Sequence, residues 1–175
     1  FVIPGRKKPA PPLAEVYRKA VLNIPALLTR PKKADVSFGR QAFNAWAERL
    51  LAEDYAGWTD EQLDLWVLHT TYVCIVATNG CEPHFLNRAI ETCPDLPFIA
   101  DARNEYAQMG RLWKDEMDAT GGSFNITRKT LRDPQARKRI AEFIRRYAGC
   151  CDRILDIYRA ANNKTTCCPV STLSE

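Results

Sequence analysis

One stretch of the chain decides its fold: Phe38-Gly39-Arg40-Gln41-Ala42-Phe43-Asn44-Ala45-Trp46-Ala47-Glu48-Arg49-Leu50-Leu51. Apolar residues recur there at multiples of four, as at Phe38, Trp46 and Leu50, while polar Gln41 and Glu48 fall between them. This period predicts an α-helix with one broad apolar face. A face of this bulk needs a large apolar partner surface, which other segments of the chain must supply.

A second apolar run covers residues 65–77 and holds no Asp, Glu, Lys or Arg. Upstream of it, Thr59 and Gln62 have the spacing of a capping box, and Asn79-Gly80 is typical of a helix end in the left-handed conformation. The pattern predicts a helix that is apolar on most sides and therefore buried in the middle of a bundle. Thirteen residues are too few to cross a bilayer, which takes about 20, so no membrane partner is expected.

Helical periods also occur over residues 13–23, 83–92, 98–117 and 134–161. Pro25 limits the first of these helices, and Asp133 followed by Pro134 is a strong start for the last. Residues 31–35 and 120–131 are predicted to be loops. Apart from the first three residues, no segment alternates with period two. The predicted fold is all-α, an irregular bundle of five to seven helices in a single domain.

The domain boundaries follow from the same pattern. Residues 1–12 are rich in Pro and Lys and are predicted to be an extended linker or the end of a preceding domain, with Phe1-Val2-Ile3 resembling the end of a strand. The chain begins without Met, which indicates a fragment or a processed product. Residues 13–161 form the predicted helical domain, and residues 162–175 a flexible tail that carries Cys167 and Cys168.

Composition limits the functional classes. A chain of 175 residues with 46% hydrophobic and 26% charged residues is long enough for one real core. The net charge is +4, and Lys and Arg gather in residues 6–8, 32–33 and 128–146. No motif that reads nucleic acid accompanies them, so they are interpreted as solvated surface and no nucleic-acid partner is expected.

The seven cysteines are odd in number and irregularly spaced, which favours a reducing, cytoplasmic compartment over a disulfide framework. Cys81, His84 and Cys93 are the nearest approach to a metal site. A structural zinc site needs four ligands in paired spacing, so small packing residues are the favoured interpretation of both cysteines. Cys150 and Cys151 are likewise interpreted as packing residues, and no cofactor is expected.

The sequence contains no phosphate loop, dinucleotide fingerprint, nucleophile elbow or HExxH motif. His69 and Cys74 are five positions apart, roughly 140° around a helix, so they cannot form a nucleophilic pair on one face. His69 is therefore predicted to be a core or seam histidine. Four aromatic residues are candidates for a ligand pocket between helices, with plain core packing as the alternative: Trp46, Trp66, Tyr72 and Trp113.

The phrase Phe38-Gly39-x-x-Ala42-Phe43-x-x-Trp46-x-x-x-Leu50 resembles one in papain-like proteins related to the butirosin-biosynthesis H protein, a group similar to peptidases that process double-glycine leaders. Phe85-Leu86-Asn87-Arg88-Ala89 matches a later element of that group, and the resemblance covers residues 1–117. It implies a catalytic cysteine and histidine in a domain upstream of Phe1, because none of the seven cysteines matches the family's nucleophile.

Three functions therefore remain open. The resemblance implies a helical accessory region of a cysteine-peptidase-like or acyltransferase-like protein, which shapes an acyl or peptide pocket beside an upstream catalytic domain. The second is a free-standing helical module that binds a small apolar ligand or a partner helix. The third is a metal- or redox-responsive helical protein. The basic last helix and the odd number of thiols permit a homodimer without requiring one.

Overall fold

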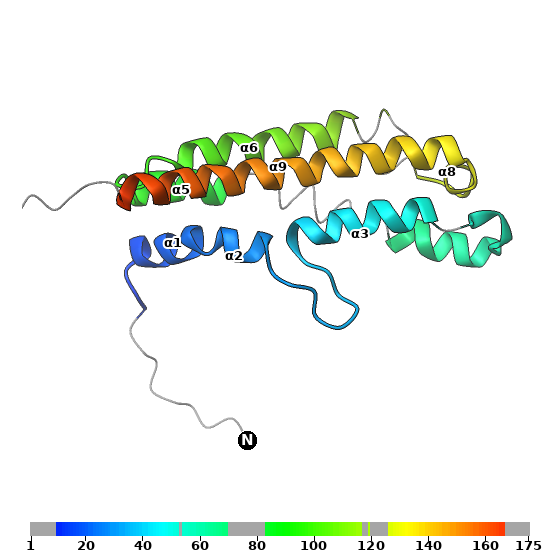
Figure 1. The fold of residues 1–175 in the computed structure, drawn as a ribbon, viewed down its shortest axis with the longest axis horizontal. Helices are drawn as coiled ribbons and strands as arrows, with labels where there is room; N and C mark the ends of the chain where they lie inside the picture. The colour runs from blue at the N-terminus through cyan, green and yellow to red at the C-terminus, as the bar shows by residue number, and fades with distance from the viewer. Residues whose placement is uncertain (1–9, 53, 70–82, 117–118, 120–125, 167–175) are drawn as a thin grey trace, which may run out of the picture.

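The fold is all-α, as the sequence predicts (Figure 1). The computed structural model describes residues 10–52, 54–69, 83–116, 119 and 126–166, with the backbone alone at residues 113, 116 and 164–166. Within these ranges there is no strand, and Lys33 and Val36 form an isolated bridge. The elements are α1 (Leu13–Leu22), α2 (Ile24–Leu28), α3 (Gly39–Ala52), η1 (Tyr55–Gly57), a helix over 60–69, α5 (His84–Thr92), α6 (Ile99–Arg111), η2 (Leu112–Glu116), α8 (Arg128–Arg132) and α9 (Pro134–Thr166).

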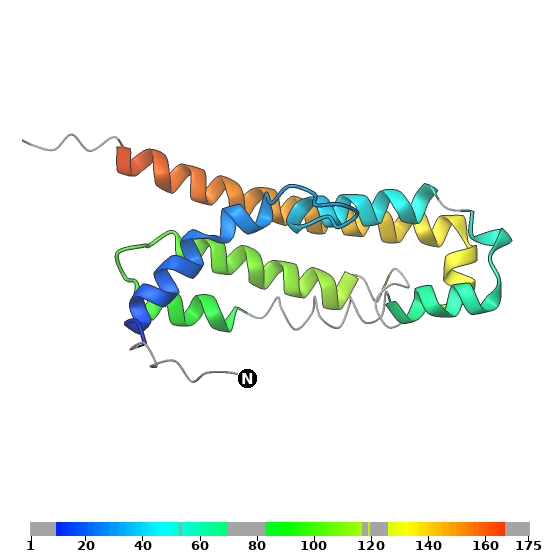
Figure 2. The same cartoon turned by 90° about the horizontal axis from the view of Figure 1, so that it is seen from below.

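The 33-residue helix α9 is the axis of the molecule, with α3 and α6 running along it on different sides (Figures 1 and 2). Its buried residues include Ile140, Ile144 and Ile154, which share one broad apolar face. Phe43 of α3 meets Tyr147 of α9 edge to face at 4.7 Å between ring centroids. None of the described helices is long and apolar enough to cross a membrane.

The helix over 60–69 lies at the periphery, so the prediction that it occupies the middle of the bundle is wrong for this part. Leu63 is buried, but the side chains of Leu65 and Leu68 are 57% and 64% exposed. Residues 70–82 lie outside the described ranges. The central position belongs to α9, because its length lets it bury one face against several helices at once.

Local signals set the helix ends. The Thr59 amide donates to Gln62 Oε1 at 2.9 Å and the Gln62 amide to Thr59 Oγ1 at 3.3 Å, which confirms the predicted capping box. The Gln135 amide donates to Asp133 Oδ1 at 2.9 Å, which confirms the start of α9. That helix ends at Thr166, five residues beyond the prediction, and the rest of the tail is outside the described residues.

Two short helices were missed in the sequence. Residues 120–131 were predicted to be loop, but α8 (Arg128–Arg132) forms across the end of this range because Thr127 and Thr130 cap it reciprocally and Leu131 is fully buried. Pro25, expected only to limit the first helix, also occupies the first turn of α2, where a missing N–H costs nothing.

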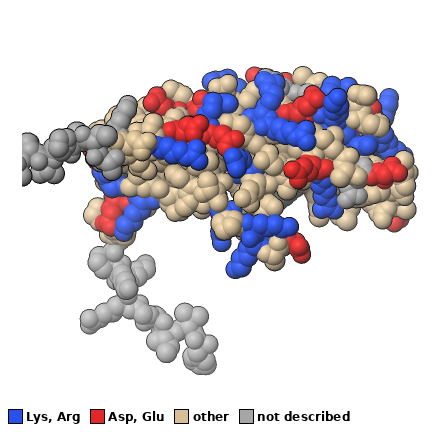
Figure 3. Space-filling view, in the orientation of Figure 1, with Lys and Arg blue, Asp and Glu red and all other residues tan. Residues whose placement is uncertain are grey.

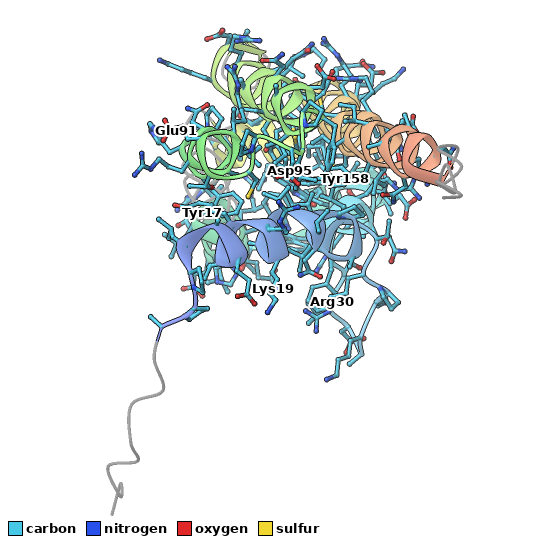
Figure 4. The ribbon with its side chains drawn as sticks, turned by 90° about the vertical axis from the view of Figure 1, so that its left-hand side faces the viewer. Tyr17, Lys19, Arg30, Glu91, Asp95 and Tyr158 are labelled. Carbon is cyan, nitrogen blue, oxygen red and sulfur yellow. The ribbon has the colours of Figure 1, made fainter. Side chains whose placement is uncertain are left out.

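At the end of the molecule opposite α8, the helices α1, α5, α6 and α9 converge (Figure 4). The Arg18 guanidinium donates to Asp95 at 2.5 Å, and this hydrogen bond lowers the pKa of the Asp95 carboxyl. The Tyr158 hydroxyl donates to the Val21 carbonyl at 3.0 Å inside the core. The first contact joins α1 to the segment between α5 and α6, and the second joins α1 to α9 across 137 residues of sequence.

Candidate functional site

An apolar groove separates α3 from the helix over 60–69. The groove is open to solvent and has a volume of about 740 Å³. Its walls are completed by residues 35–37, from the loop before α3, and by Trp58, from the turn before the helix over 60–69. The described residues that line it are Asp35, Val36, Ser37, Ala42, Phe43, Ala45, Trp46, Arg49, Trp58, Gln62, Leu65, Trp66 and His69.

The two helices offer the groove equivalent faces. On each helix, four lining residues follow the spacing i, i+3, i+4 and i+7. On α3 they are Ala42, Ala45, Trp46 and Arg49, and on the helix over 60–69 they are Gln62, Leu65, Trp66 and His69. This spacing is one stripe along a helix. Each stripe carries a tryptophan at its third position and a basic residue type at its fourth.

The apolar surface of α3 is wide enough for two purposes. Ala47 and Leu50 are buried, and Phe43 contacts Tyr147 of α9. The stripe with Trp46, half-buried, faces the groove instead. The bulk that the sequence showed on this helix is therefore divided between the core and the groove.

A buried tyrosine anchors the aromatic side of the groove. The Tyr55 ring lies 5.0 Å from the ring of Trp58 and 5.8 Å from that of Trp66, the latter edge to face. The Arg137 guanidinium lies 5.0 Å from the Tyr55 centroid on the core side. Because Tyr55 is fully buried, the indole rings of Trp58 and Trp66 pack against a side chain that belongs to the core.

Salt bridges from α8 bind the helix over 60–69 on the side that faces away from the groove. Arg128 of α8 donates two hydrogen bonds to the Asp64 carboxylate, from Nε to Oδ1 at 2.5 Å and from Nη2 to Oδ2. This contact is bidentate. Arg128 also reaches Asp60 at 2.8 Å, to which Arg132 donates at 2.7 Å. Asp60 and Asp64 lie roughly 170° around the helix from the groove stripe. The clamp therefore positions the helix without entering the groove.

The polar groups in the groove walls are few. They are Asp35 and Ser37 of the loop before α3, Arg49 of α3, and Gln62 and His69 of the helix over 60–69. His69 is exposed and lines the groove, so the prediction of a core or seam histidine is wrong. A histidine beside an apolar run can equally stand at the solvent edge of its helix.

The structure brings together two of the four predicted pocket aromatics, Trp46 and Trp66. Tyr72 and the side chain of Trp113 lie outside what the structure describes. Trp58 was missed in the sequence. Its signal was its place immediately before the capping residue Thr59, where a hydrophobic staple residue commonly stands.

The candidate metal ligands are dispersed where they can be located. His84 is exposed at the first turn of α5, while Cys93 follows the last turn, about 13 Å further along the helix. The Cys93 thiol is buried and lies 3.5 Å from the Ala14 carbonyl oxygen, as expected for a packing residue. Cys81 lies outside the described ranges. Among the residues within them, no three His, Cys, Asp or Glu side chains are grouped as metal ligands.

The two adjacent cysteines of α9 are both buried, as predicted. Arg153 donates to the Cys150 sulfur at 3.0 Å, but burial has the larger effect and raises the pKa of the Cys150 thiol. A protonated, buried thiol is a poor nucleophile. The groove, with its tryptophans, is therefore the stronger candidate site.

Comparison with known proteins adds no relative: no family model, no curated protein and no solved structure matches the chain. The resemblance to papain-like proteins stays a prediction that rests on the quoted motifs.

Proposed function

We propose that this protein is a helical binding module that takes a small apolar molecule into the groove between α3 and the helix over 60–69. One observation carries the proposal. Three tryptophans that are separate in the sequence, Trp46, Trp58 and Trp66, line one cavity of about 740 Å³. Cavities of roughly 300–1,000 Å³ with apolar and aromatic walls are typical of sites for small molecules.

The expected affinity is modest. Each buried methylene gains roughly 0.8 kcal/mol, so a chain with about eight buried methylenes gains roughly 6 kcal/mol before the cost of association. Without that cost, roughly 6 kcal/mol would correspond to a dissociation constant of about 40 µM, so the expected dissociation constant lies in the high micromolar to millimolar range. Titrations must therefore extend to the highest ligand concentration that solubility allows.

The test uses an uncharged probe, N-phenyl-1-naphthylamine, titrated against the full chain while tryptophan emission is followed. Two leucines of the same helix give a matched pair, because both are exposed but only Leu65 lines the groove. Leu65→Ala removes roughly 1 kcal/mol of contact and is expected to weaken binding about fivefold. Leu68→Ala is expected to bind like the unmodified protein.

Equal affinities for both variants and the unmodified chain would show that the probe sits elsewhere and would overturn the proposal. Absence of any saturable binding would do the same. Competition by a helical peptide, without effect of small alkyl compounds, would replace the small-molecule function by docking of a partner helix. The accessory role, the homodimer and the cytoplasmic location stay predictions, and the reading frame upstream of Phe1 tests the first of them.

A further inference from the structure

The loop before α3 forms one wall of the groove and projects from the body of the protein (Figures 1 and 3). Lys33 and Val36 exchange backbone hydrogen bonds of 3.0 Å in both directions, and Ala34 adopts a positive φ of 51°. These features define a tight hairpin over residues 30–37, called the basic hairpin below. Residues 35–37 line the groove, and the cations of the basic hairpin precede these lining residues by two to five positions in the same hairpin.

Cations predominate over carboxylates in the basic hairpin and the groove walls. The basic hairpin carries Arg30, Lys32 and Lys33, and the α3 wall adds Arg49. Counted over the same set, residues 30–37 together with the described lining residues, Asp35 is the one carboxylate against these four cations. The Lys and Arg residues of the hairpin are visible as a projecting blue cluster below the body in Figure 3.

The position of Arg30 is set by an aromatic contact. Its guanidinium lies 4.4 Å from the centroid of the Phe38 ring, at the base of the hairpin. Figure 4 shows Arg30 on the same lower side of the molecule as the hairpin and far from Tyr158 in the core. One charge of the cluster is therefore held beside the start of α3, on the hairpin side of the groove.

We propose that the ligand of the groove is an anionic amphiphile, an alkyl or aryl carboxylate. Its apolar part lies against Trp46, Trp58 and Trp66, and its carboxylate points toward Arg49 and the basic hairpin. This inference rests on the proposed function, to which it adds a charge. Because the groove is open to water, the charges act through a high dielectric and salt screens them. The expected preference for an anion is therefore about five- to tenfold.

The experiment compares three compounds with ten-carbon chains that differ in head group: decanoate, decanol and decyltrimethylammonium. Decanoate and decyltrimethylammonium are used below their micelle concentrations, and decanol below its solubility limit. Displacement of N-phenyl-1-naphthylamine from the full chain measures their affinities at 20 mM and 300 mM salt. Decanoate is expected to bind about five- to tenfold more tightly than decanol at low salt, and decyltrimethylammonium more weakly than both. The advantage of decanoate is expected to shrink at 300 mM salt.

A charge variant tests the location. Lys32→Gln with Lys33→Gln removes two cations from the hairpin without changing a lining residue, and is expected to reduce the preference for decanoate at least twofold. Lys19→Gln is the control, since Lys19 is an exposed cation of α1, paired with Glu15 at 2.7 Å and remote from the groove. Circular dichroism of each variant verifies that it is folded.

The outcomes separate the two proposals. If none of the three compounds displaces the probe, the proposed function fails together with this inference. If decanol and decanoate bind equally well, or if Lys19→Gln reduces the preference as much as the hairpin variant, the anionic ligand is refuted while the apolar groove stands. Tighter binding of decyltrimethylammonium would likewise refute it and assign the head group to Asp35.

Discussion

Gly39 lies at a position where the backbone conformation and the surrounding space both favour glycine. It begins α3 with a positive φ of 51°, a conformation that L side chains rarely adopt. A Cβ built on Gly39 would lie 2.6 Å from the carbonyl carbon of Leu28 and closer still to its oxygen. Both atoms of Leu28 are backbone, so no side-chain rotation relieves the contact.

The cost of Gly39→Ala has two parts. The left-handed conformation costs an L residue roughly 1–2 kcal/mol. Relief of the contact requires the end of α2 and the start of α3 to separate, and such backbone shifts typically cost roughly 1–3 kcal/mol. The expected loss in free energy of unfolding is therefore roughly 2–5 kcal/mol, a large share of the roughly 5–15 kcal/mol that stabilises a typical domain.

Two other glycines are controls in which the same substitution has a different expected effect. A Cβ on Gly57 would meet nothing within 4 Å, so Gly57→Ala is expected to change stability by less than about 0.5 kcal/mol. Gly149 lies inside α9, where a Cβ would approach only Arg153 Nη1 at 3.9 Å. Gly149→Ala is expected to stabilise the protein by roughly 0.5–1 kcal/mol through helix propensity.

Urea unfolding followed by circular dichroism at 222 nm measures all three variants. We expect the stability of the variants to decrease in the order Gly149→Ala, Gly57→Ala, Gly39→Ala. If Gly39→Ala unfolds within about 0.5 kcal/mol of the unmodified protein, the close approach of α2 to α3 is not present in solution. A destabilised Gly149→Ala would contradict the description of that position in α9.

Two further predictions concern polar contacts. Arg128→Gln is expected to destabilise the protein at neutral pH, because the hydrogen bond from Arg128 lowers the pKa of Asp64 in the folded state. This contribution is complete above the ordinary carboxyl pKa and is lost as the pH falls through the lower folded pKa, so urea unfolding should show variant and unmodified protein converging in acid. Tyr158→Phe is expected to cost about 1 kcal/mol in thermal unfolding, since it removes the hydrogen bond from the hydroxyl to the Val21 carbonyl, which keeps a backbone N–H donor. Burial also raises the pKa of Tyr158, so its phenolate absorbance should appear only above the pH at which exposed tyrosines titrate, about 10.

Most of the helices could be predicted from the sequence because their signals are local. The period of α3, the capping box of Thr59 and Gln62, and the Asp133-Pro134 start of α9 each act within one or two helical turns. The same is true of the break at Pro25. The short helix α8 was missed although its threonine cap is local, because the burial of Leu131 depends on packing against other elements.

The candidate site was predictable only in part. Trp46 and Trp66 were identified as pocket residues, but nothing local to either shows that they face the same cavity. Trp58 was overlooked because it stands alone between two helices, outside any apolar stripe. The exposure of His69 also depends on what packs against its helix, and the apolar residues 65–68 that precede it do not show this.

By itself, the sequence determined that this protein is all-α and where most of its described helices begin and end, because backbone hydrogen bonding and capping are satisfied by neighbouring residues. Only the tertiary structure decided that α9 is the central helix, that the helix over 60–69 is peripheral in its described part, and that a basic hairpin borders an aromatic groove. The physical reason is that the hydrophobic effect has no direction. An apolar stripe requires a partner surface, but it does not specify which one.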